Sequence, residues 1–507
     1  MSSRPVIPIP TTPAHELRVA WSCVVDDTPQ IWSSLLPWLA TAIDVAGIPA
    51  HRLHLHHVCP LRPEFDALCA KLGVRRLAIE RFDQRSPHCN KIRQCETDFG
   101  DVDRVVLTDV DIVFARPPPL ESIDAPVAGK LVDAPNPPID VLRKVFLEAG
   151  LRLPPTRSNR FQTPRREWID FDTPVGNFNG GVYVMDPGRL TAFGPRWARW
   201  ATWLLERTGL LERWSVHVDQ VAFCLGLAET GWDAQLLADE WNFPTHLRVA
   251  PSASPPVLLH HHGRLDSHLR LKAPETADAA AAVASANAAI ESFQRRHFDN
   301  RSFWNHRYAH HPDLGSGLGS RGETLEMKRG LLARLVDASP SMTVLDWGCG
   351  DLETTRLLEC ADYTGVDLSV EALRIARGKR PDWRFATPDE FYGEPSRDLV
   401  LCLDVLIHQP TRQDYLVLIE RLVASARRGL VIAGYDRPPG LGSHITYFHE
   451  PLAETLARMP GVSLVVPLGE YRDTSLYFAA TTDVAVPDCP EEPLERAAAI
   501  LRGEPAR

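Results

Sequence analysis

Two carboxylates one residue apart follow an apolar run in the N-terminal half of the chain. The run Val105-Val106-Leu107-Thr108 has the composition of a buried strand, and Asp109 and Asp111 come directly after it. Because side chains at i and i+2 of an extended segment point to the same side, both carboxylates can share one divalent cation. Mg²⁺ or Mn²⁺ suits such oxygen ligands and stabilises the charge that grows on a departing diphosphate. The pattern favours metal-assisted group transfer, although such pairs are also common in solvated turns and helix caps.

A second strand-like run, in the C-terminal half, ends in a glycine-containing turn. Val344-Leu345-Asp346-Trp347 leads into Gly348 and Gly350, and a turn of this kind lets the backbone approach a nucleotide-like ligand closely. Where the dinucleotide fingerprint has its third glycine, this chain has Glu353, which disfavours a nicotinamide cofactor. The pattern predicts a second site with a different chemistry.

The chain is too long for a single hydrophobic core. It has 507 residues, and single cores stop growing at roughly 250 to 300 residues, so two domains are expected. Hydrophobic residues make up 44% and charged residues 24% of the chain, which is typical of soluble globular proteins. The net charge of −10 argues against a general binder of nucleic acid or of anionic membranes.

The cysteines and the apolar runs bear on the compartment. Ten cysteines are scattered without the C-x-x-C spacing of a metal site, and several fall in apolar contexts that are typical of reduced side chains. The segment Met1–Leu17 lacks the features of a signal peptide, and no apolar run reaches the roughly 18 residues of a membrane span. A cytoplasmic protein without a transmembrane segment is expected.

Strands and helices must carry both motifs to the edges of sheets. In the N-terminal half, strands are expected over 17–25, 52–58, 74–80, 104–107, 178–185 and 257–259, and helices over 30–46 and 197–208. The segment 123–171, heavy in proline and arginine, has little period of either kind and is expected to form loops around a site. In the C-terminal half, strands are expected over 363–366, 399–403 and 429–433, alternating with helices, and a closing hairpin over 462–466 and 475–480.

The domain limits follow from composition. An alanine-rich segment with Pro274 at its start and no helix breaker predicts a helical spacer. The expected parts are a flexible head 1–16, a first domain 17–273, the spacer 274–300, a second domain 301–483 and a peripheral tail 484–507.

The N-terminal motifs resemble glycosyltransferases of the GT-A fold, especially the group that contains glycogenin and the bacterial galactosyltransferases of lipopolysaccharide synthesis. The acid pair is followed in order by Phe178-Asn179-Gly180-Gly181, by Asp219-Gln220 and by His260-His261-His262-Gly263. The resemblance covers 17–266 and implies a mixed sheet, a bound Mn²⁺ or Mg²⁺, a nucleotide-sugar donor and a glycan acceptor.

This resemblance implies a role for each matching position. The metal ligands would be Asp109, Asp111 and His260, with His262 as the alternative histidine. Donor or acceptor would be bound by Lys91, Asn179, Gly180 and Gln220. Asp219 would lie near the reacting sugar carbon, and its other interpretation, a cap for the helix that follows, is equally open.

The C-terminal motifs resemble class I S-adenosylmethionine-dependent methyltransferases over 303–483, with a Rossmann-like doubly wound sheet. The segments that carry the resemblance are Leu345–Gly350, Tyr363–Asp367 and Leu401–His408. Asp367 would accept both ribose hydroxyl groups of the methyl donor, which one carboxylate can do. The other donor-binding residues implied are Asp346, Gly348, Gly350, Asp389, Tyr308 and Arg321.

The last of these segments would supply the catalytic residues. Asp404 and His408 would lie near the sulfonium and the acceptor, and His408 is the candidate general base because imidazole titrates near neutral pH. Two other interpretations are open, namely that His408 satisfies a helix terminus and that Asp389 is a solvated acid.

The motifs together predict a bifunctional transferase that adds a sugar from a nucleotide donor and methylates an oxygen on the same or a related glycan. One alternative makes the N-terminal domain a nucleotidyltransferase with the same use of the cation. Another makes it a non-catalytic glycan-binding module that presents substrate to the methyltransferase. In each case no nucleic-acid partner is expected.

Overall fold

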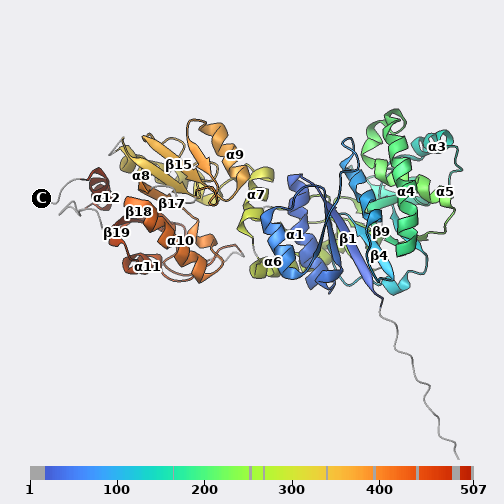
Figure 1. Cartoon of the computed structure of the whole chain (residues 1–507), viewed down its shortest axis with the longest axis horizontal. Coiled ribbons are helices and arrows are strands. Elements are labelled where there is room, and N and C mark those ends of the chain that lie inside the picture. Colours follow the sequence, from blue (N-terminus) through green and yellow to red (C-terminus); the bar gives the residue numbers. More distant parts are fainter. Residues whose placement is uncertain are drawn as a thin grey trace, which may run out of the picture. The chain divides into compact units, whose positions relative to one another are not determined.

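The computed structural model describes residues 17–163, 165–249, 254–266, 269–297, 299–337, 341–391, 396–440, 445–481 and 492–503, so the predicted head 1–16 lies outside the described residues. The described chain forms two compact units (Figure 1). The first comprises the residues up to Asp266 with Arg270–Ile290, and the second comprises Leu269 and the residues from Glu291 onward. Each unit contains one seven-stranded sheet flanked by helices, which confirms the predicted α/β class.

A mixed sheet in the order β10-β6-β9-β4-β1-β2-β3 forms the centre of the first unit. Its parallel strands are β1 (Val19–Val25), β2 (Leu53–His57), β3 (Arg75–Ala78) and β4 (Arg104–Thr108). Antiparallel to β4 runs β9 (Phe178–Met185), which also pairs with β6 (Val127–Leu131), and β10 (Gln235–Leu236) lies at the edge. Strands β4 and β9 are buried along most of their length, as their apolar composition requires.

The core of this unit is aromatic. Its helices are α1 (Pro29–Asp44), α2 (Pro63–Leu72), α3 (Ile139–Glu148), α4 (Pro187–Leu205), α5 (Val218–Thr230) and α6 (Ala280–His297). Tyr183 of β9 stacks on Phe223 of α5 with ring centroids 4.2 Å apart, and Trp197 of α4 meets Phe223 edge to face at 5.1 Å. These contacts fix the N-terminal end of α5, which carries Asp219, against β9.

The prediction of loops over 123–171 is wrong. That segment contains β6, α3 and an antiparallel ribbon of β7 (Thr156–Gln162) and β8 (Trp168–Pro174), with β12 (Arg248–Val249) paired to the other edge of β7. Most side chains of the ribbon are exposed or half-buried, so the hydrophobic alternation that marks a strand is missing. Cross-strand pairing holds these strands together instead.

A small sheet brings distant segments of the first unit together. It has the order β11 (Phe243–Pro244), β13 (Leu258–His260) and β5 (Ile112–Phe114). Because β13 runs antiparallel to β5, His260 lies opposite Ile112.

The second unit is a doubly wound sheet in the order β16-β15-β14-β17-β18-β20-β19. The parallel strands are β14 (Thr343–Trp347), β15 (Asp362–Val366), β16 (Arg384–Ala386), β17 (Arg397–Cys402) and β18 (Ala426–Gly434). The predicted closing hairpin is present as β19 (Val462–Tyr471) and β20 (Thr474–Thr481). The helices are α7 (Asn300–His310), α8 (Gly322–Asp337), α9 (Val370–Lys379), α10 (Arg412–Ser425), α11 (Leu452–Arg458) and α12 (Pro493–Arg502).

The prediction of a peripheral tail is wrong for α12. This helix begins with Pro493 in its first turn and ends at Gly503 in the left-handed conformation. Its side chains Ala497, Ile500 and Leu501 are fully buried in the same hydrophobic cluster as residues of β18 and β20. The tail therefore contributes to the core of the second unit.

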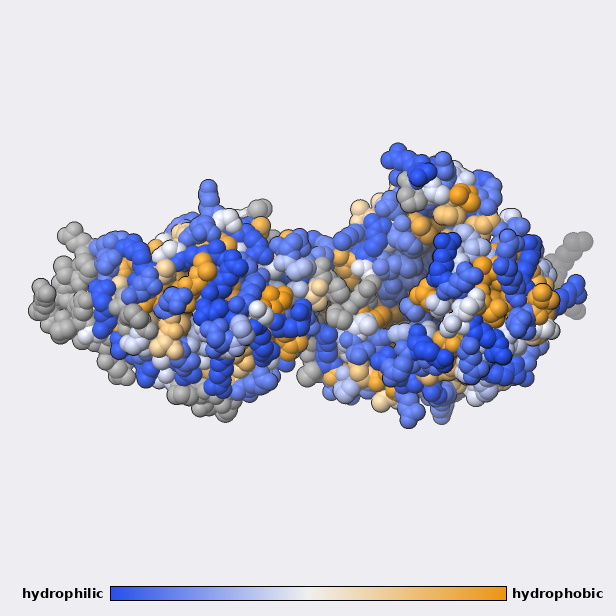
Figure 2. Space-filling model, turned by 90° about the horizontal axis from the view of Figure 1, so that it is seen from above, coloured by the Kyte–Doolittle hydropathy of each residue, from blue (hydrophilic) through white to orange (hydrophobic). Residues whose placement is uncertain are grey.

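Among the described residues, no helix is both long and apolar enough to cross a membrane. The face in Figure 2 is mainly hydrophilic over both units, with hydrophobic residues in small, scattered groups.

Candidate functional site

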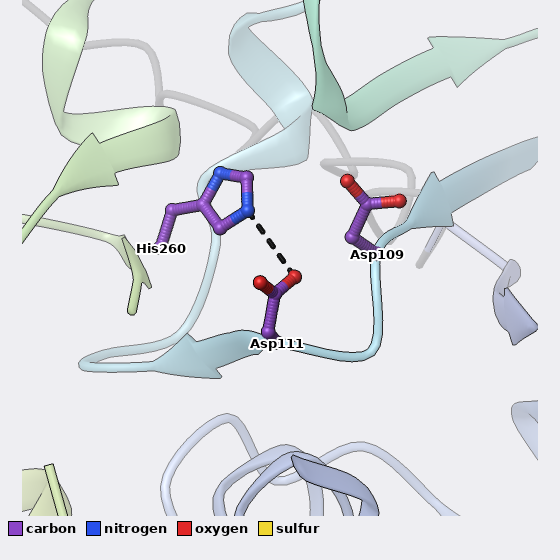
Figure 3. A group of neighbouring side chains, drawn as sticks. All are labelled: Asp109, Asp111 and His260. Atoms are coloured by element: carbon purple, nitrogen blue, oxygen red, sulfur yellow. Dashed lines mark ion pairs between the residues drawn. The ribbon is translucent and has the colours of Figure 1, made fainter. Parts of the chain in front are cut away.

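Three side chains at the ends of β4, β5 and β13 meet in the first unit. Asp109 follows β4, Asp111 precedes β5 and His260 ends β13. One potential ligand atom from each residue lies within 4.8 Å of the other two, and His260 Nε2 is 3.2 Å from Asp111 Oδ1 (Figure 3). The fold thus brings together the three residues that the sequence analysis proposed as metal ligands.

A hydrogen bond orients the imidazole of His260. Nδ1 donates to the side-chain oxygen of Asn242 at 3.0 Å, and Nε2, which lies 3.2 Å from Asp111 Oδ1, donates to that carboxylate when the ring is protonated. Loss of the Nε2 proton leaves a lone pair there that a cation can use. Burial disfavours the charged imidazole, but the Asp111 carboxylate outweighs burial and raises the pKa of His260. Two carboxylates and an imidazole lone pair form a donor set that fits Mn²⁺ or Mg²⁺.

The glycine pair at the start of β9 is required by close packing. A Cβ on Gly181 would lie 2.8 Å from both His260 Nδ1 and Asn242 Nδ2, and a Cβ on Gly180 would lie 2.7 Å from Lys91 Nζ. A side chain at either position would displace His260 and Asn242 or Lys91, which surround the acid pair. The two glycines therefore serve the site because they lack a side chain, and not because they form a turn.

Replacing Gly181 with alanine is expected to weaken divalent-cation binding roughly 10- to 100-fold, because the new methyl group would break the bond that orients His260. Titration of the purified protein with Mn²⁺ in a calorimeter measures this change. Gly188→Ala is the matched control, since a Cβ at Gly188 meets nothing within 4 Å. Equal cation affinity in the two variants would contradict the orienting role.

Lys91 occupies the centre of the acidic cluster. It comes from the 3₁₀ helix η2 (Pro87–Glu96), and its Nζ lies 2.7 Å from Asp109 Oδ1 and 3.3 Å from Asp219 Oδ2. Burial opposes its charge, but Asp109 and Asp219 together raise the pKa of Lys91. Lys91 also donates to the carbonyl oxygen of Gly180 at 3.0 Å, so this buried ammonium ties η2, β4, β9 and α5 together.

The remaining predicted substrate residues, Asn179 and Gln220, are held by hydrogen bonds near the acid pair. Asn179 donates to Asp133 Oδ2 at 2.8 Å, and Gln220 donates to the carbonyl oxygen of Asn136 at 2.6 Å. Asp133 was not singled out in the sequence, because it lies in the segment that was expected to be a loop. It is buried and forms an ion pair with Lys130.

The proposed metal ligands, the predicted substrate residues and Asp133 border one cavity of about 1700 Å³, a volume that includes the solvent at its mouth. That space is ample for a sugar nucleotide. Its lining includes Asp26, Lys91, Asp109, Asp111, Asp133, Asn179, Gly180, Asp219, Gln220, His246, His260 and His262.

A second cavity, of about 840 Å³, lies in the second unit. It is formed where β14, β15 and β17 end, which is where open α/β sheets bind ligands. Its lining includes six of the predicted residues, namely Tyr308, Asp346, Gly348, Asp367, Asp404 and His408.

The two glycines after β14 are in backbone conformations that favour glycine. Gly348 has φ +84° and Gly350 has φ +54°. A Cβ on Gly348 would lie 2.1 Å from Cγ2 of Val405, and a Cβ on Gly350 would lie 2.4 Å from Ser316 Oγ. The predicted glycine turn is present, and its sharp path keeps side chains out of the cavity floor.

Two buried carboxylates border this cavity. Asp367 accepts from the backbone N–H groups of Gly350 at 3.0 Å and Ser369 at 2.8 Å, and burial raises its pKa to about 6. Burial likewise raises the pKa of Asp346 to about 6, although the Tyr363 hydroxyl donates to it at 2.5 Å. The backbone N–H groups fix the orientation of the Asp367 carboxylate.

Asp404 is held by two residues that the sequence motifs do not include. Its Oδ2 accepts from Lys328 Nζ at 2.5 Å, and its Oδ1 accepts from the Tyr471 hydroxyl at 2.6 Å. Asp404 has φ +61°, an uncommon conformation for an aspartate, and Lys328 is 1% exposed. Lys328 comes from α8 and Tyr471 from β19, so only the tertiary structure joins them to the motif after β17.

His408 lines the cavity with one ring nitrogen engaged. Its Nδ1 lies 2.7 Å from the carbonyl oxygen of Ile445, which can only accept, so the neutral ring carries its proton on Nδ1. Burial lowers the pKa of His408, which leaves Nε2 unprotonated at neutral pH. This geometry is compatible with a general base at His408 Nε2. The alternative interpretation, in which His408 satisfies a helix terminus, gives Nε2 no role.

Three predicted donor-binding residues, Gly350, Arg321 and Asp389, are absent from the lining of this cavity. Gly350 belongs to the glycine turn beside it, whereas Arg321 and Asp389 have partners elsewhere. Arg321 donates to the carbonyl oxygens of Ser320 and Asp313, and Asp389 forms an ion pair with Arg301 at 3.1 Å. The Asp389 side chain is 78% exposed, as in the solvated-acid interpretation. Neither residue is part of the cavity lining, whereas the neighbouring residues Ser320 and Pro388 are.

Comparison with known proteins finds a methyltransferase domain over residues 345–429. No curated protein sequence matches the chain. One similar solved structure is magnesium protoporphyrin IX methyltransferase (ChlM) from Synechocystis PCC 6803 with bound SAH, with 21% identity, 38% of this chain and 100% of that chain covered, and a TM-score of 0.28. Galactosyltransferase LgtC in complex with donor and acceptor sugar analogs has 14% identity, 54% and 95% coverage and a TM-score of 0.35. Mouse xyloside xylosyltransferase 1 has 13% identity, 48% and 96% coverage and a TM-score of 0.30.

The methyltransferase match spans β14 to the beginning of β18, and therefore includes the glycine turn, Asp367, Asp404 and His408. The second unit thus contains a methyltransferase domain, as the sequence motifs predicted. The similar solved structures thus include a methyltransferase and two glycosyltransferases.

Proposed function

We propose that this protein is a bifunctional transferase, with a metal-dependent glycosyltransferase site in the first unit and an S-adenosylmethionine-dependent methyltransferase site in the second. The acceptor of both reactions is a glycan, and the methylated atom is an oxygen. The observation that carries the proposal is the convergence of Asp109, Asp111 and His260 at a large cavity that also contains Lys91 and Asp219.

In the first site, Asp109, Asp111 and His260 would hold Mn²⁺ or Mg²⁺. The cation supplies neutralisation of the charge on a departing nucleoside diphosphate. Lys91 adds positive charge beside the acids, and Asn179 and Asp133 present polar groups to the donor or the acceptor sugar. Asp219, which is held by Lys91 and lines the cavity, would contact a sugar hydroxyl.

In the second site, the bound donor supplies an electrophilic methyl group on sulfur. The Asp367 carboxylate would accept the ribose hydroxyl groups, and the turn Gly348–Gly350 would let the donor approach the backbone. His408 Nε2 would remove the proton from the acceptor hydroxyl, while Lys328 and Tyr471 hold the Asp404 carboxylate at the cavity.

The test is incubation of the pure protein with Mn²⁺ and a panel of nucleotide sugars. Release of a nucleoside diphosphate from at least one sugar supports glycosyl transfer. Release of pyrophosphate from a nucleoside triphosphate and a sugar phosphate would support a nucleotidyltransferase instead, and no turnover of either kind would favour a glycan-binding module.

Replacing His408 with glutamine is expected to lower methyl transfer to a panel of glycosides on the order of 10²-fold, because the base is lost while the bond to Ile445 can be kept. Affinity for S-adenosylmethionine should not change. In the unaltered enzyme, kcat for methyl transfer should fall at low pH, and the midpoint of that fall should lie below 6.5, the ordinary pKa of a histidine, since burial lowers the pKa of His408. His449→Gln is the control, because His449 is not among the residues that line the cavity.

Affinity for S-adenosylmethionine is expected to fall as the pH is lowered through about 6, the value to which burial raises the pKa of Asp367. The sign follows because the protonated carboxyl has one oxygen occupied by its own proton and cannot accept both ribose hydroxyl groups. Calorimetric titrations from about pH 8 to about pH 5 measure the change, and Asp367→Asn should remove it. A dependence that persists in this variant would assign the titration to Asp346 instead.

We also propose a reducing, cytoplasmic location. All nine cysteines among the described residues are free, and most are buried, which accords with thiols that act as small hydrophobic side chains.

A further inference from the structure

A smaller cavity of about 700 Å³ borders the proposed glycosyltransferase site in the first unit. Its lining is Gln162, Thr163, Arg166, His246, Leu247, Arg248 and Glu275. His246 and Leu247 also line the larger cavity that contains the acid pair. The two cavities are therefore neighbours that share a wall, and we call the smaller one the arginine groove.

Within the part of the chain that the structure describes, no carboxylate is paired with the two arginines of the arginine groove. Arg166 and Arg248 are exposed, and neither forms an ion pair with any other described residue. The one carboxylate in the lining, Glu275, is already paired with Arg264 at 3.3 Å. Guanidinium groups that lack a carboxylate partner can bind carboxylates and phosphates well.

The strand register extends this groove into a polar row with an aromatic end. Arg248 of β12 lies opposite Gln162 of β7, and Gln162 lies opposite Trp168 of β8. Cross-strand partners point to the same face of a sheet, so the three side chains form one row. Trp168 is 44% exposed, and the Arg160 guanidinium lies 5.9 Å from the centroid of its ring. The exposed part of the indole offers an apolar surface on which a sugar ring can stack.

We propose that the arginine groove binds an anionic group, a carboxylate or a phosphate, on the acceptor glycan. The proposal rests on the proposed function of the neighbouring cavity, because it assigns the groove to the acceptor of that reaction. Arg166 and Arg248 would bind the anion, and Trp168 would stack on an adjacent sugar ring. One N–H of the Gln162 amide donates to the carbonyl oxygen of Arg166 at 2.9 Å, and the other would donate to the same residue of the glycan. The substrate class is thus an acidic glycan.

The test uses the full-length protein without added metal or nucleotide sugar. Methyl glucuronide, methyl glucoside 6-phosphate and the neutral methyl glucoside are titrated separately into it by calorimetry. We expect at least one of the anionic glycosides to bind at least tenfold more tightly than the neutral one, and the difference should shrink at high salt. Which anion binds more tightly tells a carboxylate acceptor from a phosphate acceptor.

The double variant Arg166→Gln/Arg248→Gln should lower the affinity for the anionic glycoside at least tenfold. Arg157→Gln is the matched control, because Arg157 is an exposed arginine of β7 at a register position of the opposite face. Equal binding of charged and neutral glycosides, an equal loss in the control, or no binding of either anion at about 10 mM would overturn the proposal.

A second measurement separates this proposal from the function of the larger cavity. Hydrolysis of nucleotide sugars in the presence of Mn²⁺ should be unchanged in the double variant, because neither arginine lines that cavity. If no nucleotide sugar is hydrolysed but anion binding still depends on the two arginines, the transferase function fails and the anion site stands as a binding site alone.

Discussion

Replacing Asp111 with asparagine is expected to abolish measurable binding of Mn²⁺ and to lower nucleotide-sugar hydrolysis by the first site on the order of 10³-fold. The carboxylate of Asp111 is the group that faces His260 Nε2, and its loss removes both a ligand and the charge that attracts the cation. Calorimetry measures the cation affinity directly, and release of nucleoside diphosphate measures the reaction.

Asp140→Asn is the control for that substitution. Asp140 lies on α3, is 81% exposed and pairs only with Arg143 of the same helix among the described residues, so its replacement removes the same charge from a position remote from the cavity. Cation affinity that survives in Asp111→Asn would sink the assignment of the metal ligands. A loss of affinity with unchanged donor hydrolysis would show instead that the reaction does not need the cation.

The second large effect is expected from Asp367→Asn, which should weaken binding of S-adenosylmethionine roughly 100-fold. The two proposed hydrogen bonds from the ribose hydroxyl groups to the charged carboxylate are weakened. A loss of about 3 kcal/mol in binding free energy corresponds to that factor. The new amide would also place an N–H group beside the N–H groups of Gly350 or Ser369, which now donate to the carboxylate. Equilibrium titration with the methyl donor measures the affinity.

Asp389→Asn provides the comparison for this experiment, and it decides between two interpretations of Asp389. The sequence-based resemblance implies that Asp389 binds the methyl donor, whereas its side chain is largely exposed and paired with Arg301. We expect the variant to bind the donor as the unaltered protein does. A comparable loss of affinity in both variants would mean that Asp389 moves into the site when the donor binds.

Much of the fold could be predicted because strong local patterns agree with the tertiary structure. The apolar runs before Asp109 and before Gly348 are strands β4 and β14, buried in the middle of their sheets. The segment 123–171 could not be predicted in this way, since the ribbon β7–β8 is stabilised by pairing between strands and carries few buried side chains. Helix α12 was missed because a short apolar stripe at the end of a chain does not reveal what it packs against.

The candidate sites likewise contain residues that the sequence predicts and residues that only the tertiary structure brings in. The sequence by itself determined the residue types that the chemistry needs, namely the acid pair, the glycine turns, Asp367 and His408. Each of these follows an apolar run that could be recognised as a strand, and side chains that follow a strand lie at the edge of its sheet. Only the tertiary structure decided which distant partners hold them. Asn242 orients His260 from eighteen residues away, and Lys328 and Tyr471 hold Asp404 from α8 and β19. Such pairs depend on the packing of whole elements, and packing distances leave no period or spacing in a single chain.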